Sequence, residues 1–194
     1  MQSEQQLSLP LVDHGSSEGP QKAVLDRAKA EVGFVPNMYA GMVNSPGLLE
    51  TYLTGYKLFR EESGFTPPEQ EVIFLTISRN NGCTYCVSAH SMLAEKASKL
   101  DNAVTEAIRT NQPIEDAKLA ALSRFTNVMV DTRGLPSQAE MQAFLDAGYS
   151  ERHILEVVLA ISVKTLSNYA NHLFHTPLDD VFGAYAWTDH KAAA

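Results

Sequence analysis

The chain has 194 residues, of which 44% are hydrophobic and 20% are charged, and its 15 Lys and Arg against 23 Asp and Glu give a formal net charge of −8. This length predicts one globular domain, and without a basic cluster no nucleic-acid partner is expected. Apolar runs such as Val157–Ile161 are far shorter than the roughly 18 residues of a membrane span. The N-terminus has no pattern of a secretory signal, so a cytoplasmic protein without a membrane partner is expected.

The first third of the chain predicts an arm followed by two helices. Residues 1–18 are polar and lack periodicity, which predicts a flexible N-terminal arm. Apolar residues at three- and four-residue spacing then predict a helix over Pro20–Gly33. After a break at Pro36, the same spacing predicts a second helix over Pro46–Gly64, which opens on a proline where its missing N–H costs nothing.

A strong helix start follows at Thr66, because Thr66 can cap, Pro67 suits the first turn and Glu69 can complete a capping box. The next segment, Glu71–Ser78, is ambiguous, since a short β-branched apolar run also suits a buried strand. The start signal and the reach of about fourteen residues to the turn at Asn80–Gly82 favour a helix.

The rest of the chain predicts five more helices. They cover Cys83–Ala97, Asp101–Arg109, Ala117–Val130, a segment capped by Ser137 that ends at Gly148, and Glu151–Phe174. No alternating strand pair or internal repeat is present. The expected fold is all-α, a single-domain helical bundle of about seven or eight helices over residues 19–186, followed by a tail at 187–194.

The two cysteines, Cys83 and Cys86, lie within four residues, so a disulfide between them would close almost no loop and could not staple the fold. On a helix, Cys83, Cys86 and His90 point within about 60° of one another. The thiols lie in the first turn, where free N–H groups and the helix dipole favour a thiolate. This arrangement is typical of reversible dithiol–disulfide chemistry.

Glu71 lies twelve residues before Cys83 on the preceding predicted helix and interrupts an apolar stretch, so it needs a partner if it is buried. If the two helices fold back on each other, Glu71 comes near His90. A carboxylate that accepts a hydrogen bond from an imidazole orients it and raises its basicity, and such a histidine can take a proton from a thiol.

Glu71, eleven further residues, Cys83-x-x-Cys86, three residues and His90 resemble the signature of the alkylhydroperoxidase (AhpD-like) branch of the carboxymuconolactone decarboxylase superfamily. The match is clearest over Phe65–Ala97 and extends across about Val32–Phe182. The resemblance implies an AhpD-like all-α fold and a thiol-dependent peroxidase.

By the same resemblance, Cys86 corresponds to the thiol that attacks the peroxide, Cys83 to the resolving thiol, and His90 with Glu71 to the proton relay. The cycle takes Cys86 to a sulfenic acid and then to a disulfide with Cys83. A dithiol donor, a lipoyl-bearing protein in the characterised branch, reduces that disulfide. No metal and no cofactor are expected. Many members have a second histidine directly before the second cysteine, where this chain has Tyr85.

Three alternatives to a thiol-dependent peroxidase remain open at this point. The superfamily's other activity, lactone decarboxylation, needs no dithiol. A non-enzymatic module could bind zinc through Cys83, Cys86, His90 and Glu71, or it could sense redox changes through the two cysteines. The cysteines could also be small buried hydrophobes. His172 and His175 are interpreted as histidines that complement a helix C-terminus rather than as metal ligands.

A homo-oligomer is expected as well. The segments Val72–Ile77 and Val157–Val163 read as apolar on all faces, and one small domain has difficulty surrounding two such helices. The prediction is therefore helix–helix contact between subunits, with the dithiol near a subunit boundary. The family resemblance also points to dimers, trimers or hexamers.

Overall fold

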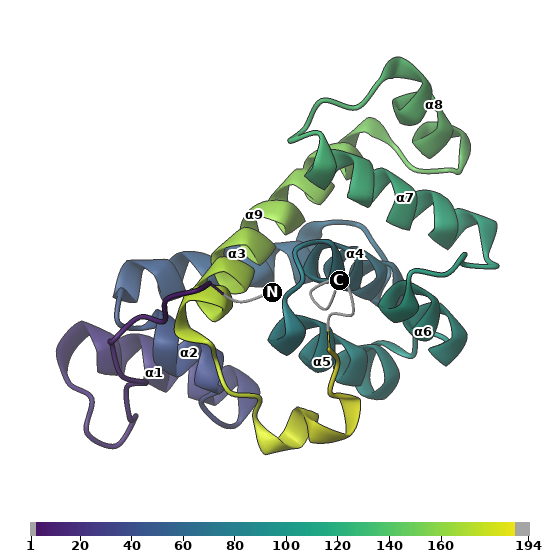
Figure 1. Ribbon diagram of the computed structural model, residues 1–194. Coiled ribbons are helices and arrows are strands. Elements are labelled where there is room, and N and C mark those ends of the chain that lie inside the picture. The colour runs from purple at the N-terminus through teal and green to yellow at the C-terminus, as the bar shows by residue number, and fades with distance from the viewer. Residues whose placement is uncertain (1–2, 189–194) are drawn as a thin grey trace.

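The computed structural model describes residues 3–188, and within this range the chain is all-α, with no strand (Figure 1). Eight of its helices have nine or more residues, in agreement with the prediction from the sequence. The α-helices are α1 (Gly19–Val32), α2 (Asn37–Met42), α3 (Pro46–Glu62), α4 (Pro67–Asn80), α5 (Thr84–Leu93), α6 (Asn102–Thr110), α7 (Ala117–Asp131), α8 (Gln138–Asp146) and α9 (Glu151–Phe174). A π-helical turn, Ala94–Ser98, and a 3₁₀-helix, Asp180–Tyr185, complete the described elements.

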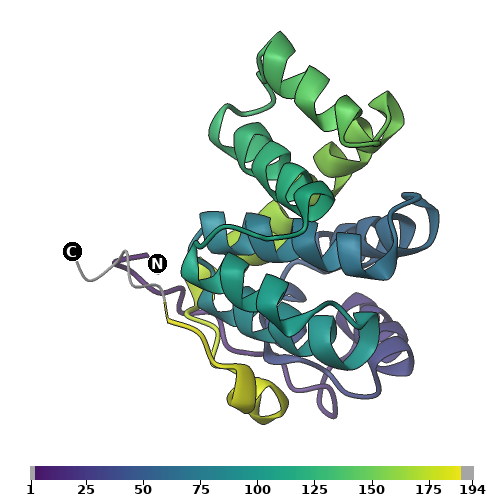
Figure 2. The ribbon, with the colours of Figure 1, turned by 90° about the vertical axis from the view of Figure 1, so that its right-hand side faces the viewer.

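Helix α4 lies at the centre of the bundle and contacts α5, α6, α7 and α9. Helix α9, the longest, passes beside α4 and also contacts α2 and α3. Figures 1 and 2 show α7, α8 and the first half of α9 projecting together above the rest of the molecule. The central α4 therefore brings the N-terminal helices, the C-terminal helix and α5 around one core.

The start of α4 explains why an apolar, β-branched segment folds as a helix. Thr66 accepts a hydrogen bond from the backbone N–H of Glu69, and the Glu69 carboxylate accepts one from the backbone N–H of Thr66 at 2.9 Å. This capping box satisfies two backbone donors at the helix start, and Pro67 supplies a φ angle suited to the first turn. The residues from Glu69 to Ser78 are all buried by the same chain.

Two short elements were not predicted. Helix α2 has six residues, too few to show a helical period, and the sequence predicts no element between the break at Pro36 and the helix that begins at Pro46. Its first N–H, on Asn37, donates to the carboxylate of Asp179 at 3.1 Å, a partner 142 residues away. The 3₁₀-helix Asp180–Tyr185 packs on α5. Both depend on tertiary contacts between distant parts of the chain.

The segment Val157–Val163, expected to be hard for one small domain to surround, is only partly buried within this chain. Val157 and Val163 are buried, but Val158 is 43% exposed and Ser162 is exposed. One face of α9 packs on α3 and α4, and the opposite face lies on the surface of the chain. With Leu155 at 70% exposure, this face carries large apolar side chains.

The terminal segments follow the surface of the bundle. The expected arm, residues 1–18, is described from Ser3 onwards and pairs by backbone hydrogen bonds with α9 and α2: Leu7 N–H donates to Leu173 at 2.9 Å, and Val12 N–H donates to Ala40 at 2.9 Å. Of the expected tail 187–194, only Trp187 and Thr188 lie within the described residues. The domain boundaries stay a prediction. Across the described chain, no helix is both long and apolar enough to span a membrane.

Candidate active site

The two cysteines lie where α4 turns into α5. Gly82 has a φ of 67°, a conformation that a residue with a side chain rarely adopts, and the Cys83 N–H then donates to the Ser78 carbonyl at 2.9 Å. Cys83 is the N-cap of α5, and its sulfur accepts from the Cys86 N–H at 3.4 Å. Both cysteines are unbridged and buried. The turn thus places both thiols at a helix N-terminus, as the sequence predicted.

Glu71 and His90 are in contact, as expected from the folding back of α5 on α4. Glu71 Oε2 lies 2.8 Å from His90 Nδ1. The other oxygen, Oε1, accepts hydrogen bonds from Arg60 of α3 at 2.5 Å and from Ser98 of the π-helical turn at 3.3 Å. Burial raises the pKa of the Glu71 carboxyl, but His90 and Arg60 outweigh it and the pKa lies below its usual value. Glu71 is therefore a buried carboxylate whose charge is compensated.

His90 is neutral near pH 7, although Glu71 raises its basicity as expected. Burial, followed by the positive charge of Lys164, lowers the pKa of His90 to about 4, and the opposing effect of Glu71 is smaller. Because Nδ1 faces the Glu71 carboxylate, the proton of the neutral ring belongs on Nδ1. Nε2 is then the nitrogen that can accept a proton.

The sequence analysis missed a polar stripe on α9. It consists of Lys164, Ser167, Asn168 and Asn171, all buried. Asn171 Nδ2 lies 3.2 Å from Cys86 Sγ and 3.7 Å from Cys83 Sγ, and Ser167 Oγ lies 4.0 Å from Cys86 Sγ. At about 100° per residue the four side chains share one side of the helix. Polar residues that recur at this spacing in an otherwise apolar helix could have revealed the stripe from the sequence.

These surroundings make the two thiols unequal. Burial raises the pKa of Cys86, but a hydrogen bond from Cys83 and the charge of Lys164 outweigh it and lower the pKa to about 5. Burial and the nearby Cys86 instead raise the pKa of Cys83 well above its usual value. Near pH 7 the pair therefore consists of a Cys86 thiolate and a Cys83 thiol.

Three polar atoms of the α9 stripe are buried and have no hydrogen-bond partner among residues 3–188. They are Lys164 Nζ, Asn168 Nδ2 and Asn171 Oδ1. Two are donors and one is an acceptor, and they belong to the stripe that faces the sulfurs. Buried polar atoms without partners are rare in folded proteins, so this set calls for a functional explanation.

Tyr85, the residue directly before Cys86, contacts the C-terminal segment. Its hydroxyl donates to Asp179 at 2.5 Å, and its ring packs edge-on against Phe182 at 5.8 Å. Burial and Asp179 raise the pKa of this phenol. Tyr85 therefore ties the C-terminal segment to α5, a contact between parts of the chain 94 residues apart.

The remaining candidates lie outside this cluster. His175 ends α9 in a left-handed conformation and lies 2.8 Å from the Ser3 carbonyl. Over residues 3–188 no group of three His, Cys, Asp or Glu is arranged to hold a metal ion. The zinc reading of Cys83, Cys86, His90 and Glu71 therefore has no support in the donor geometry, since Glu71 is engaged by His90, Arg60 and Ser98.

Comparisons with known proteins agree with the fold. Residues 46–127 match the carboxymuconolactone decarboxylase family. The structure is similar to an AhpD-core peroxidase-related protein from Ralstonia eutropha JMP134, with a TM-score of 0.77 and 19% identity over 90% of this chain and 93% of that one. A peroxidase-related protein from Silicibacter sp. TM1040 is similar as well, with a TM-score of 0.75 and 19% identity over 93% of this chain and 95% of that one.

A third similar structure is a cysteine-to-alanine variant of the debrominase Bmp8 in complex with 2,3,4-tribromopyrrole. Its TM-score is 0.73 and its identity is 17%, over 93% of this chain and 97% of that one. Identities this low show a shared fold. No curated protein matches the chain.

Proposed function

Because the chain carries a carboxymuconolactone decarboxylase family domain in an AhpD-like fold, we propose that it is a thiol-dependent peroxidase that reduces small hydroperoxides. The observation that carries this proposal is the set of unpartnered polar atoms beside the Cys86 thiolate. A hydroperoxide group offers both an O–H donor and acceptor oxygens, and so can satisfy Asn171 Oδ1 and the two donors at once.

The reaction proceeds in three balanced steps. The Cys86 thiolate attacks one peroxide oxygen, the O–O bond breaks, and one proton is taken up, which yields a Cys86 sulfenic acid and an alcohol or water. The Cys83 thiol then loses its proton and attacks the Cys86 sulfur, which releases water and forms the disulfide. A dithiol donor finally transfers two electrons and restores the pair.

His90 serves the second step. Because Cys86 is already a thiolate near pH 7, the proton that must be removed is the one on Cys83, whose pKa is raised. Neutral His90, held by Glu71 through Nδ1, presents Nε2 as the acceptor. Glu71, in turn, is fixed by Arg60, so the relay is anchored by three helices.

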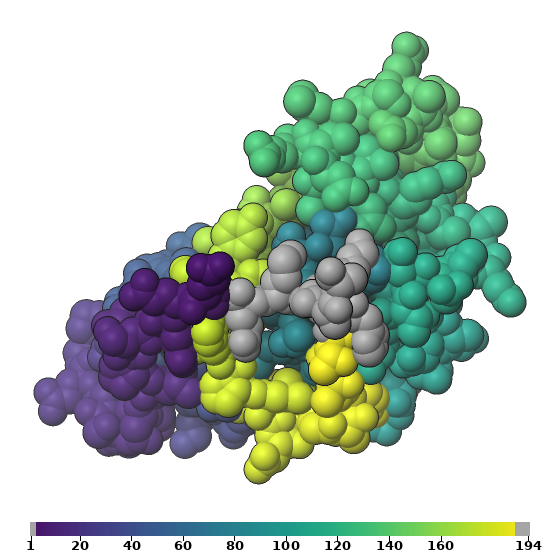
Figure 3. Space-filling model, viewed as in Figure 1, coloured from purple at the N-terminus to yellow at the C-terminus, as the bar shows by residue number. Residues whose placement is uncertain are grey.

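The dithiol donor and the assembly state belong to the proposal. A lipoyl group, a dithiol on a long flexible arm, suits sulfurs that lie below the surface. Figure 3 shows the molecule hollowed beside the yellow C-terminal segment. A homo-oligomer is supported by the exposed apolar face of α9, defined by Leu155, Val158, Tyr169 and Leu173.

A second candidate is reductive dehalogenation of an aromatic ring by the same dithiol. The Bmp8 structure has this fold and is named a debrominase. In this chain burial raises the pKa of the Tyr39, Tyr52 and Tyr56 phenols, and a thiolate at Cys86 adds a smaller effect to each. These rings place aromatic surface near the dithiol. Two electrons from the dithiol would replace a C–Br bond by C–H and release bromide.

The test is a single-turnover assay on the reduced protein. Equimolar hydrogen peroxide or cumene hydroperoxide should be consumed with the loss of two thiols and of about two mass units, as a disulfide forms. Cys86→Ser should consume no peroxide. If the wild type keeps both thiols with peroxide but loses them with a bromopyrrole, releasing bromide, dehalogenation replaces peroxide reduction.

A further inference from the structure

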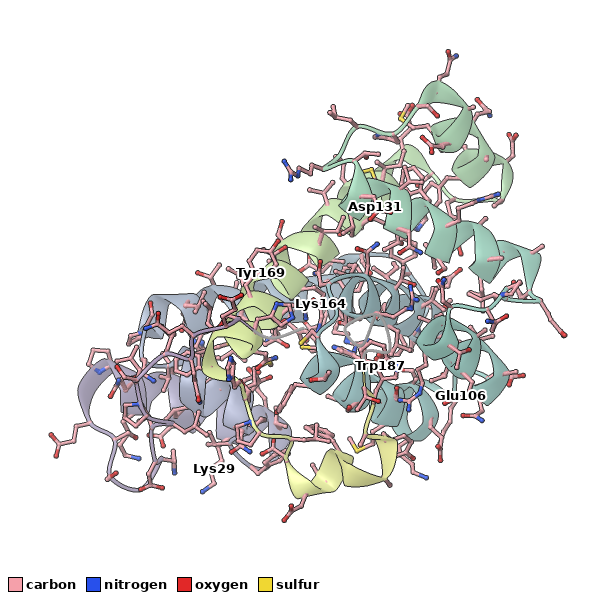
Figure 4. All side chains as sticks on the ribbon, in the orientation of Figure 1. Lys29, Glu106, Asp131, Lys164, Tyr169 and Trp187 are labelled. Atoms are coloured by element: carbon pink, nitrogen blue, oxygen red, sulfur yellow. The ribbon has the colours of Figure 1, made fainter. Side chains whose placement is uncertain are left out.

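Lys164 is a fully buried lysine in the middle of α9 (Figure 4). Its Nζ lies 5.5 Å from the centre of the Phe74 ring and has no hydrogen-bond acceptor within the part of the chain that the structure describes. An ammonium group taken out of water is costly unless an opposite charge compensates it. A charged Lys164 therefore needs an anion nearby.

The carboxylates of the core are committed elsewhere. Among residues 3–188, the buried acidic side chains are Glu69 and Glu71. Glu69 pairs with Lys118 at 2.8 Å, on the outer side of α4. Both oxygens of Glu71 are engaged, one with His90 and the other with Arg60. Neither carboxylate is free for Lys164. The remaining candidate is the sulfur of Cys86, because Ser167, about one turn after Lys164 on the same side of α9, lies 4.0 Å from it.

The charges of the buried site balance only when Cys86 is a thiolate. The titratable and charged groups of this site come from five helices. They are Lys164 on α9, Cys86 and His90 on α5 with Cys83 at its N-cap, Glu71 on α4, Tyr52, Tyr56 and Arg60 on α3, and Tyr39 on α2. Arg60 and Glu71 cancel, His90 and the tyrosines are neutral near pH 7, and Lys164 is cancelled by Cys86. Oxidation to the disulfide removes the thiolate and leaves one uncompensated positive charge.

We propose that Lys164 is the charge-compensating residue of the dithiol: it holds Cys86 as a thiolate and favours reduction of the Cys83–Cys86 disulfide. The inference deepens the proposed function and rests on its redox dithiol. Reduction breaks the S–S bond and takes two electrons and one proton; the proton goes to Cys83, and Cys86 is released as a thiolate. A donor dithiol gives two electrons and two protons, so the second proton goes to solvent.

The consequence is a readily reduced disulfide. The Cys86 thiolate, which exists only in the reduced form, stabilises the buried positive charge of Lys164. The charge of Lys164 therefore shifts the equilibrium from the disulfide towards the reduced pair. Disulfides whose reduced form is stabilised in this way are strong oxidants. The resting enzyme is therefore kept reduced by ordinary cellular dithiols, without a specially strong reductant.

The test compares Lys164→Met and Lys164→Gln with the wild type and with Lys57→Met, which removes a lysine charge from the exposed side of α3. Thiolate absorbance against pH gives the Cys86 pKa, and equilibration with glutathione buffers gives the equilibrium constant for reduction. Both Lys164 variants should raise the pKa of Cys86. They should also lower the equilibrium constant for reduction at pH 7 at least tenfold, whereas Lys57→Met should change neither quantity. Unchanged values in a folded Lys164 variant would overturn the proposal.

A measurement on the wild type keeps the proposal falsifiable if the variants do not fold. Two glutathione thiols give two protons and the protein keeps one, so between pH 6 and 8 the equilibrium constant for reduction by glutathione should rise about tenfold per pH unit. A constant that does not change with pH means that both protein thiols are protonated, and this contradicts the proposal. Neither assay uses peroxide, so a failure of peroxide reduction alone leaves the role of Lys164 standing.

Discussion

Asn171 Nδ2 lies 3.2 Å from the sulfur of Cys86, although the two residues are 85 positions apart. The same amide nitrogen is 3.7 Å from Cys83. An N–H donor at this distance stabilises a thiolate more than a thiol, because hydrogen bonds to charged groups are the stronger ones. Helix α9 therefore completes a site that begins on α5.

Asn171→Ala should raise the pKa of Cys86 by about one unit or more, since a hydrogen bond to a charged group contributes about 1.5–3 kcal/mol. The second-order rate of alkylation by iodoacetamide at pH 6 should fall about twofold if the pKa rises by one unit from 5, and about tenfold if it rises by two. Asn80→Ala is the matched control, because Asn80 bonds to Asn127 and Asp131 of α7, away from the thiols. An equal effect of both variants would assign the change to folding rather than to the thiolate.

Trapping of the sulfenic acid with dimedone distinguishes the roles of the two cysteines. Cys83→Ser should react with peroxide once and hold a Cys86 sulfenic acid that dimedone labels, because no resolving thiol is present. Cys86→Ser should give no labelling at equimolar peroxide. Mass spectrometry of the labelled peptides decides this, and labelling of the Cys86 variant alone would reverse the assignment.

His90→Gln should act on disulfide formation and not on the first attack. Cys86 is a thiolate near pH 7, so its alkylation rate should stay within a few-fold of the wild type. Conversion of the sulfenic acid to the disulfide should slow by about 100-fold or more, the usual size of a lost general base. Stopped-flow tryptophan fluorescence with dimedone competition measures this step. A large loss of alkylation with normal resolution would place the relay on Cys86 instead.

The stability of the reduced protein should rise with pH across the neutral range. The pKa of Cys86 falls from 9.0 to about 5 on folding, so between these values the unfolded chain binds more protons than the native one. The stabilisation is present in full above about pH 9 and is lost as the pH falls towards 5, with a slope of up to about 1.4 kcal/mol per unit.

Urea unfolding of the reduced protein at pH 6, 7 and 8 measures this slope, and Cys86→Ala provides the reference. His90, with its pKa lowered from 6.5 to about 4, adds a slope of the same sign only below about pH 6.5. The contribution of Cys86 is therefore isolated at pH 7–8. Equal slopes for the wild type and Cys86→Ala in that interval would contradict a native thiolate.

The exposed face of α9 should form a subunit contact. Leu155 and Val158 are 70% and 43% exposed, and Tyr169 and Leu173 continue the same face. Light scattering should give a mass that is a multiple of 21.3 kDa. Leu155→Glu with Val158→Glu should reduce it to one chain, since charges placed in an apolar contact are left without partners.

The control for this contact is Leu135→Glu, a substitution at a side chain that is 78% exposed in the loop between α7 and α8. It should leave the mass unchanged. A wild-type mass near 21 kDa that persists on concentration would show that the α9 face stays exposed to solvent.

The sequence alone determined the helices and the local half of the site. Capping residues such as Thr66 and Ser137, together with apolar periodicity, act within a few residues, so the starts of α4 and α8 could be predicted. The phase of Cys83, Cys86 and His90 follows from helix geometry. Even the contact of Glu71 with His90 could be inferred, since only one short turn separates their helices.

Only the tertiary structure decided the charge of the site. Asn171 and Lys164 come from α9, far along the chain from the thiols, and no local pattern specifies which helix packs there. Sequence reasoning supplied only the effect of Glu71 on the basicity of His90, because desolvation and the Lys164 charge depend on what surrounds the ring. A pKa is a property of the folded environment, and that environment is assembled from parts of the chain far apart in sequence.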